Sequence, residues 1–297
     1  MPGRRKKPGN ISLLQLAFNP ATLMLIVTVA IAGLWNQLHP QLFPAGQATL
    51  SGDALQVSAP PPWIRTPVRE VAIRDSRLNE VTLQQPDSVE RVAAALAVQP
   101  WIKTIESIHK TSTGIRARVA WRKPVGIVEF SNDQLVPVDD ESVVLEGEGL
   151  VMNDPLEYWR ISVPGPLTNG LTSGRVWDDL RIQDAVRIVN FCEARQVDLG
   201  LIRVVNRSYP TADRIRLNPY ELWTPGGTIV FWGNPPGHEA ADEATAAEKF
   251  QALAEFVEDN GPLDSCPWPM LDVRQGTVRQ AEPGLADASA DFIHQLK

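Results

Sequence analysis

Cysteine and histidine are scarce in this sequence. Among 297 residues there are two cysteines and four histidines, and the histidines are scattered at His39, His109, His238 and His294. Protein zinc sites are built mainly from cysteine and histidine at short, regular spacings. No such spacing occurs, and there is no Cys-x-x-Cys. The sequence therefore predicts no metal site.

The two cysteines leave one alternative open. Cys192 and Cys266 could form a disulfide if the chain reaches an oxidising compartment. Cys192, however, lies on the apolar face of a helix predicted below, where a free thiol behaves as a small hydrophobe. We expect two free thiols, with one disulfide as the alternative.

Sequence motifs of enzymes are also missing. The chain has no Gly-x-Ser-x-Gly, His-Glu-x-x-His or P-loop pattern, and hence no recognisable nucleophile, general base or metal site. The pair at 226–227 is typical of a hairpin turn and the segment 236–239 of a loop. The acidic run of Asp139, Asp140 and Glu141 is typical of a solvated turn. We expect a protein that is not an enzyme and has no cofactor or small-molecule substrate.

Charged residues are absent between Lys7 and Asp53. Inside this gap residues 21–38 are almost wholly apolar, and with the apolar residues before them the segment reaches the roughly 20 residues that cross a bilayer. Trp35 stands where an interfacial aromatic is expected, and the basic residues at 4–7 favour a cytoplasmic N-terminus. The sequence predicts a cytoplasmic tail at 1–12, a single-pass inner-membrane anchor at 13–38, and an extracytoplasmic body.

A cleaved signal peptide is the alternative to a retained anchor. Ala30 and Ala32 form an A-x-A pattern after a short apolar run, as a signal peptidase would require. The apolar run continues through Leu34, Trp35 and Leu38, past the possible cleavage point. This continuation favours an anchor that stays attached.

The charge balance also excludes a class of partner. Four of the 28 basic residues lie at positions 4–7, so the rest of the chain has 24 basic and 35 acidic residues, a net charge of −11. Nucleic-acid-binding domains carry basic surfaces. We expect no nucleic-acid partner.

The first exported region divides into a spacer and a small α+β unit. Residues 39–67 are assigned to a spacer, because the five prolines in 43–67 disfavour both helix and central strand. Helical spacing of apolar residues at 89–97 and a β-rich run at 102–108 follow. Strict alternation at 115–121 then predicts a half-buried strand, with Arg116, Arg118 and Arg122 on its solvated face. This unit is assigned to 68–125.

The rest of the body predicts a second unit, residues 126–281. Short β-like pieces at 126–130, 134–138 and 142–145 precede a helix at about 178–196, whose apolar face includes Cys192, and a strand at 201–205. Strands at 214–224 and 228–232 flank the turn residues 225–227 and predict a hairpin. A helix at about 243–260 ends at Gly261. Short strands follow at 270–274 and 277–280, and residues 282–297 are expected to be a flexible polar tail.

Several stretches resemble the FtsQ/DivIB family of bacterial cell-division proteins. Residues 100–103 are similar to its P-W-V-K strand, residues 115–125 to the strand closing in E-R-x-P-V-A, and residues 138–141 to its V-D-x-x-G element. Residues 220–233 resemble a family hairpin, and residues 271–274 its D-L-R strand. The usual first strand of the family, with an I-x-V-x-G pattern, is not evident before Val68.

This resemblance implies an α+β fold: an N-terminal transmembrane helix, a βααββ POTRA domain, and a C-terminal mixed α/β domain dominated by an antiparallel sheet. It implies a non-catalytic scaffold of the septation complex, contacting membrane proteins of the FtsB and FtsL type. The docking surface would be the edge at residues 276–280, which follows the D-V-R strand at 272–274. Its partner-binding residues would be Asp272, Arg274, Gly276, Thr277, Val278 and Arg279. The arginines at 116, 118 and 122 would form the POTRA surface.

Two other functions remain open from the sequence. One is a POTRA-bearing component of protein export, which would be expected to carry several POTRA repeats or a following β-barrel. The other is a membrane-tethered envelope enzyme, which would be expected to have a deep polar pocket holding an acid or base with a shifted pKa.

Overall fold

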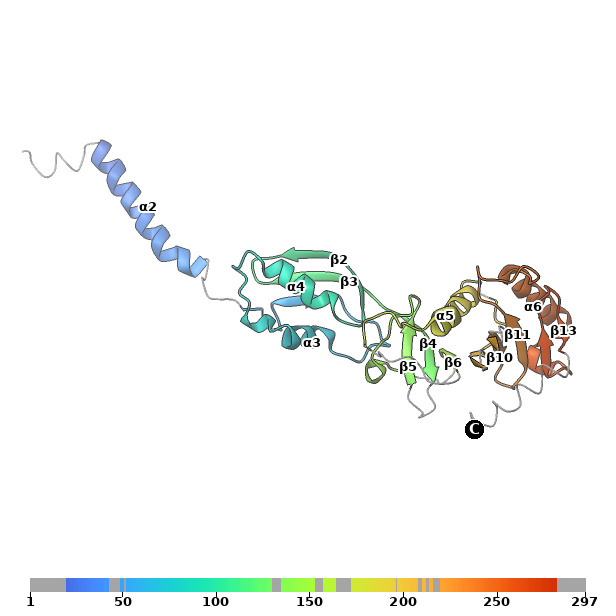
Figure 1. The fold of residues 1–297 in the computed structure, drawn as a ribbon. Helices are drawn as coiled ribbons and strands as arrows, with labels where there is room; N and C mark the ends of the chain where they lie inside the picture. The colour runs from blue at the N-terminus through green and yellow to red at the C-terminus, as the bar shows by residue number, and fades with distance from the viewer. Residues whose placement is uncertain are drawn as a thin grey trace, which may run out of the picture.

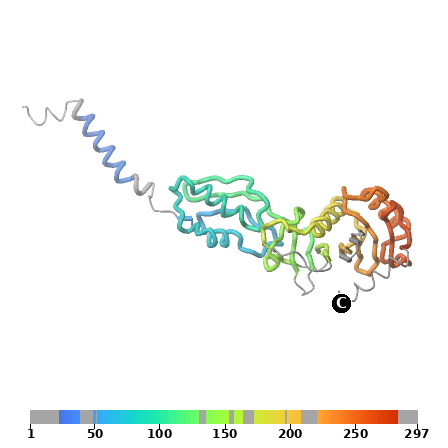
Figure 2. The backbone as a smooth tube through the Cα atoms, viewed as in Figure 1, coloured from blue at the N-terminus to red at the C-terminus, as the bar shows by residue number. Residues whose placement is uncertain are grey.

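A computed structural model describes residues 20–42, 49–50, 52–129, 135–152, 157–163, 172–195, 197–207, 210–211, 214–215 and 220–281; within these, side chains are not described at 20–22, 39–42, 210–211 and 214–215. The predicted cytoplasmic tail at 1–12, the first part of the predicted anchor at 13–19 and the predicted flexible tail at 282–297 lie outside the described residues. The rest forms one helix and two α+β units in line (Figures 1 and 2).

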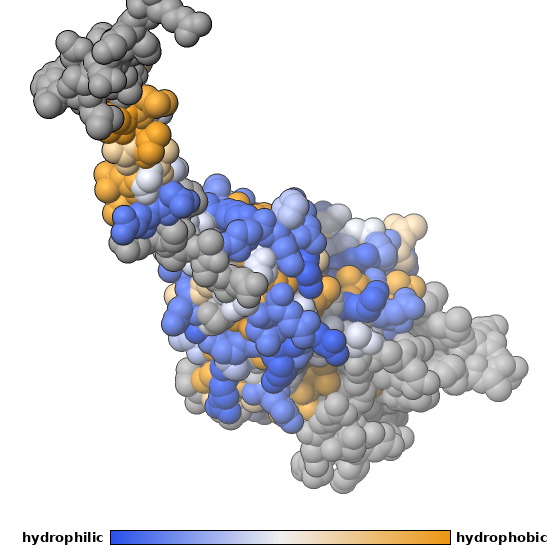
Figure 3. All heavy atoms as spheres, turned by 90° about the vertical axis from the view of Figure 1, so that its left-hand side faces the viewer, coloured by the Kyte–Doolittle hydropathy of each residue, from blue (hydrophilic) through white to orange (hydrophobic). Residues whose placement is uncertain are grey.

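Helix α2 covers Pro20–Leu42. Its described side chains, residues 23–38, are all exposed, including Met24 at 74% and Val29 at 64%. They form the orange column in Figure 3, next to a mostly hydrophilic face of the first unit. Among the residues that the structure describes, no helix has the length and apolarity that a membrane crossing requires. The predicted anchor stays a prediction.

The first unit has the element order βααββ. It consists of β1 (Leu55–Val57), α3 (Val68–Asp75), a short 3₁₀ turn η1 (Leu78–Glu80), α4 (Ser88–Ala97), β2 (Ile102–Lys110) and β3 (Ile115–Trp121). The sheet order is β1-β3-β2, with β1 parallel and β2 antiparallel to β3. Apolar side chains from both helices and all three strands fill one core.

Strand β1 corrects the sequence interpretation, because it lies inside the segment expected to be a spacer. The prolines of this segment stand before β1, at 40 and 44, and after it, at 60–62 and 67, so none interrupts the strand. Gly114 explains how β1 reaches β3: a Cβ there would overlap the carbonyl oxygen of Ala54, which accepts a hydrogen bond from the N–H of Ile115. Only glycine permits this close approach of two backbones.

The second unit is built on an eight-stranded sheet. Its order is β13-β12-β11-β10-β7-β6-β4-β5, formed by β4 (Pro124–Glu129), β5 (Leu135–Asp139), β6 (Trp159–Ser162), β7 (Arg203–Asn206), β10 (Tyr220–Trp223), β11 (Ile229–Gly233), β12 (Met270–Asp272) and β13 (Arg279–Gln280). Pairs β4/β6, β6/β7 and β11/β12 are parallel and the rest antiparallel. The sheet is therefore more mixed than expected.

Two helices cover this sheet. Helix α5 (Leu180–Glu193) starts at Asp179, whose carboxylate accepts from the N–H of Arg181, and α6 (Ala246–Asn260) starts with a capping box of Thr245 and Glu248. The predicted cap Gly261 ends α6 at φ +82°, and the predicted hairpin joins β10 to β11. The minor elements are η2 (Gly147–Gly149), η3 (Leu263–Ser265) and the pair β8 (Pro210–Thr211) and β9 (Arg214–Ile215).

The expected boundary at residue 125 does not separate two cores. On β4, Ile127 belongs to the core of the first unit and Val128 to that of the second, because successive strand residues face opposite sides. Leu145, Leu150 and Tyr158 also pack into the first core. The units share strand β4 and the segment after β5, so they are joined by packed side chains.

Candidate interaction surface

Strand β13 forms one edge of the eight-stranded sheet. It pairs with β12 through Leu271↔Gln280 and Asp272↔Arg279, and the N–H of Ala281 donates to the carbonyl of Met270. In an antiparallel pair, residues alternate between bonding to the partner strand and pointing away from it. The N–H and C=O of Gln280 therefore point outward, away from β12.

A tight turn aims β13 back along β12. Gly276 adopts φ +72°, and its N–H donates to the carbonyl of Val273. A Cβ at Gly276 would stand 3.2 Å from the Cβ of Ala244, beside α6. The turn is thus shaped both by a left-handed conformation, which favours glycine, and by contact with the segment that leads into α6.

Of the predicted docking residues, Asp272 and Arg274 are engaged with each other. The guanidinium of Arg274 donates to both carboxylate oxygens of Asp272, through hydrogen bonds of 2.6, 3.0 and 3.2 Å. Burial by itself raises the pKa of Asp272, but the hydrogen bonds from Arg274 outweigh it and hold that pKa below its usual value. The carbonyl of Arg274 accepts from the N–H of Ala244. These two residues stabilise the turn.

The remaining predicted residues divide by exposure. Thr277 and Arg279 are exposed, whereas Gly276 and Val278 are partly buried, and Val278 packs against the core of the second unit. The surface that a partner could contact is therefore the backbone edge at Gln280 together with the side chains of Thr277 and Arg279.

The predicted arginine surface is only partly as expected. Arg116 and Arg118 are exposed on β3, where Arg116 donates to Gln56 and Arg118 lies 3.4 Å from Glu106. Arg122 is different, because its side chain is only 13% exposed. The chain leaves β3 at Trp121, so the strand alternation no longer governs Arg122. The assignment of Arg122 to the solvated face was wrong.

The acidic run at 139–141 is likewise more than a solvated turn. Asp139 is fully buried; one carboxylate oxygen pairs with Arg122, and the other accepts from the N–H groups of Glu141 and Val143. Asp140 binds Lys103 of β2 at 2.8 Å, and its carbonyl accepts from Asn190 of α5. The turn thus ties the sheet of the first unit to the second.

The pKa shifts in this turn follow from the pairing. The hydrogen bond from Arg122 is the main reason that the pKa of Glu141 lies below its usual value. The hydrogen bond to Asp140 raises the pKa of Lys103. Both shifts favour the charged forms that make the pairs.

The histidine and cysteine side chains that could take part in catalysis or metal binding do not form a site. His238 is exposed, with its Nε2 3.2 Å from Arg187. Both thiols are free; Cys192 is buried, and desolvation raises its pKa to about 12, which keeps the nucleophilic thiolate scarce. Within the described residues no group of three or more His, Cys, Asp or Glu side chains could hold a metal ion.

A buried ion pair that the sequence did not reveal supports the β13 end. Lys249 on α6 is fully buried and pairs with Glu243, which also accepts from the N–H of Asn234 at 2.7 Å. Burial raises the pKa of Glu243, but its hydrogen bonds, first that from Lys249, outweigh burial and lower it. A lysine inside a helix of mixed polarity gives no sequence signal of burial.

Comparison with known proteins adds no relative: no family model matches the chain, and no curated protein matches it.

Proposed function

We propose that this protein is a non-catalytic, membrane-anchored scaffold of the bacterial septation complex, of the FtsQ/DivIB type. In this proposal the apolar segment at 13–38 anchors the chain in the inner membrane, with the N-terminus in the cytoplasm. The two α+β units then stand outside the cytoplasm and hold division proteins together by surface contacts.

The order of the modules supports the proposal. The resemblance implies a βααββ domain followed by a sheet domain, and the first unit has that element order with the sheet order β1-β3-β2. The first strand of the βααββ order, which the sequence did not reveal, is present as β1. The second unit follows directly and ends in an edge strand.

The outward edge of β13 is the single observation that carries the docking role. An extended segment of a partner can add to such an edge through backbone hydrogen bonds. The partner we propose is a single-pass division protein of the FtsB type. It would align with Thr277 to Gln280 and meet the exposed side chain of Arg279.

Proline at Gln280 tests strand addition. Because Gln280 is exposed and its N–H points outward, Gln280→Pro deletes a donor to the partner while the bonds at Arg279 and Ala281 to β12 remain. Val278→Pro is less informative, since Val278 packs into the core. We expect Gln280→Pro to reduce capture of the FtsB-type protein from membranes at least about tenfold, a loss of about 1.4 kcal/mol, and the matched Gln280→Ala to leave it nearly unchanged.

Undiminished capture by Gln280→Pro, with thermal unfolding as in the parent, would exclude this edge as the docking site.

Two further measurements test the proposed location and the proposed membrane anchor. A fluorescent fusion should gather at the division site, and protease added to spheroplasts should digest the body. An even distribution along the cell, or a mature chain beginning near Gly33, would contradict the proposed role or the anchor.

A further inference from the structure

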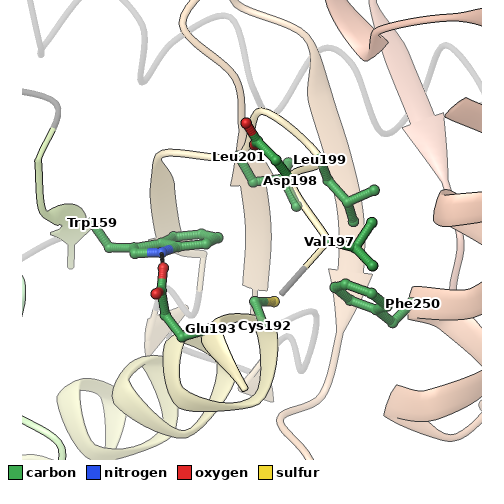
Figure 4. Close-up of a pocket in the computed structure, with 8 residues that line it drawn as sticks. All are labelled: Trp159, Cys192, Glu193, Val197, Asp198, Leu199, Leu201 and Phe250. Atoms are coloured by element: carbon green, nitrogen blue, oxygen red, sulfur yellow. Dashed lines mark hydrogen bonds between the residues drawn. The ribbon is translucent and has the colours of Figure 1, made fainter. Parts of the chain in front are cut away.

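A cleft lies between the end of α5 and helix α6, on the side of the sheet that the two helices cover. It has a volume of about 300 Å³. In Figure 4, Trp159 and Glu193 stand on one side of it, Val197 and Phe250 on the other, and the Cys192 side chain between them. Leu199 and Leu201, in the segment leading to β7, complete the lining. The cleft is separated from β13 by β10, β11 and β12 in the sheet order.

The walls of this α5–α6 cleft are apolar and in part open to solvent. Trp159, Leu199 and Phe250 present apolar surface although each is at most 9% exposed overall, whereas Val197 on the rim is 48% exposed. Clefts that take up a ligand combine such apolar walls with a few placed polar groups. A volume of about 300 Å³ accommodates one large side chain, aromatic or aliphatic.

The polar groups at the rim are acidic. Glu193 and Asp198 are both exposed; Glu193 accepts a hydrogen bond of 2.7 Å from the indole N–H of Trp159 through Oε1, and Asp198 accepts from the N–H of Gly200. Glu193 is also the last residue of α5, the end at which a helix dipole is negative. All three features attract a cation.

The neighbouring cation does not neutralise this rim by contact. The guanidinium of Arg195 lies 3.2 Å from the ring centroid of Phe191 and donates to the carbonyl of Phe191. It also lies 5.5 Å from the ring centroid of Phe250, one wall of the cleft, so Arg195 is held just beyond the end of α5 between two aromatic rings. The described residues show no ion pair between Arg195 and Glu193 or Asp198. The cleft keeps an apolar interior beside two carboxylates.

We propose that the α5–α6 cleft binds a segment of a second protein in which a large apolar side chain stands next to lysine or arginine. The apolar side chain enters between Trp159 and Phe250, and the basic neighbour meets Glu193 and Asp198. This inference does not depend on the docking role of β13, because the two surfaces share no residue.

Two segments could occupy the cleft, a basic segment of a second protein or residues 282–297 of this chain, and their charges distinguish them. The sequence after Ala281 includes Phe292 and Ile293, but its acidic residues are Glu282, Asp287 and Asp291 against the single Lys297. An acidic tail is repelled by an acidic rim. The complementary occupant is a basic segment supplied by another protein.

Fluorine NMR on the full chain in lipid nanodiscs tests the proposal. The nine tryptophans are replaced by 5-fluorotryptophan, and the resonance of Trp159 is identified by its loss in Trp159→Phe. The probes are four synthetic peptides of equal length, with the central sequence Lys-Phe-Lys, Ser-Phe-Ser, Glu-Phe-Glu or Lys-Ala-Lys. We expect a saturable shift of the Trp159 resonance with Lys-Phe-Lys, binding at least about tenfold weaker for Glu-Phe-Glu, and none for Lys-Ala-Lys.

Two variants locate the binding. Val197→Arg places bulk and positive charge on the rim and should abolish the shift, while Glu193→Gln with Asp198→Asn keeps both hydrogen-bond acceptors and should weaken Lys-Phe-Lys to the level of Ser-Phe-Ser. The matched control neutralises two exposed carboxylates away from the cleft, near the end of α6, by Glu258→Gln with Asp259→Asn. It should change neither the shift nor the affinity.

Three outcomes would overturn the proposal. The first is no saturable shift with any peptide, and the second is equal affinity for Lys-Phe-Lys and Glu-Phe-Glu. The third is a shift that is seen only after residues 282–297 are removed, which would mean that the chain's own tail fills the cleft.

Discussion

The two edge strands of the eight-stranded sheet, β5 and β13, differ in whether other parts of the chain pair with their outer sides. At one end β5 is covered: Val138 bridges to Val144, and the N–H of Leu145 donates to the carbonyl of Pro137. At the other end, among the described residues, no strand pairs with the outer side of β13. Unpaired edges invite strand addition, and proteins commonly cover them. The β5 end is thus closed by the chain itself, whereas the β13 end is the edge at which we propose that a partner docks.

Removing the Asp139 side chain should have the largest effect on stability, because its hydrogen bonds hold the turn that follows β5. Asp139→Ala leaves Arg122 without its buried partner and the N–H groups of Glu141 and Val143 without an acceptor. We expect a loss of about 3–5 kcal/mol in the free energy of unfolding, measured by denaturant titration of the full chain in detergent. The control Asp140→Ala removes an exposed carboxylate and should cost less than about 1 kcal/mol. Equal losses would contradict the structural role of Asp139.

Gly276 tests the open end. Gly276→Ala forces a left-handed conformation on a residue with a Cβ and should cost about 1–2 kcal/mol. Because the turn aims β13, capture of the FtsB-type partner should also weaken. Gly237→Ala is matched in φ, at +83°, with open space around it. Gly237→Ala should lower stability by a similar amount without changing capture of the partner. If Gly237→Ala weakened capture as much as Gly276→Ala does, the turn at Gly276 would have no specific role in docking.

Acid should weaken the support of the β13 end. The pKa of Glu243 is lower in the folded chain than its ordinary 4.5, so its contribution to stability is present above the unfolded pKa and is lost as pH falls through the folded value. Glu243→Gln should therefore be less stable than the parent at pH 7, with a difference that narrows as the pH falls below the ordinary 4.5. A series of denaturant titrations from pH 7 downwards measures this, and a constant difference would contradict it.

The exposed arginines of the first unit should matter least. Arg118 and Glu106 are 71% and 50% exposed, and exposed ion pairs contribute little because water and salt screen them. We expect Arg118→Ala to change the free energy of unfolding by less than about 0.5 kcal/mol. A loss as large as that of Asp139→Ala would show that exposure is a poor guide to the role of these residues.

Periodicity predicted the elements whose pattern is long and regular. The alternation at 115–121, the helical faces of α5 and α6, and the glycines at 226–227 and 261 all carry a local signal, and the corresponding elements are present. Strand β1 carries none: it has three residues, and it is held by pairing with β3, some 60 residues away in the chain. Strand β6 was missed for the same reason.

The candidate sites divide in the same way. Arg122 and Asp139 look like surface charges in the sequence, because their burial arises only when the two units pack together. The edge at β13 could be proposed from the resemblance to the FtsQ/DivIB family, but its outward-facing residue, Gln280, follows from the register with β12. The α5–α6 cleft joins Trp159, Val197 and Phe250 from distant segments, and no local pattern predicts it.

Amide hydrogen exchange at Gln280 tests the central proposal most directly. In the free protein the N–H of Gln280 should exchange quickly, while that of Arg279, which faces β12, is protected. When the FtsB-type partner is bound, Gln280 should become protected to a similar degree, because its N–H then donates to the added strand. Rapid exchange at Gln280 in the bound state would contradict docking by strand addition at β13.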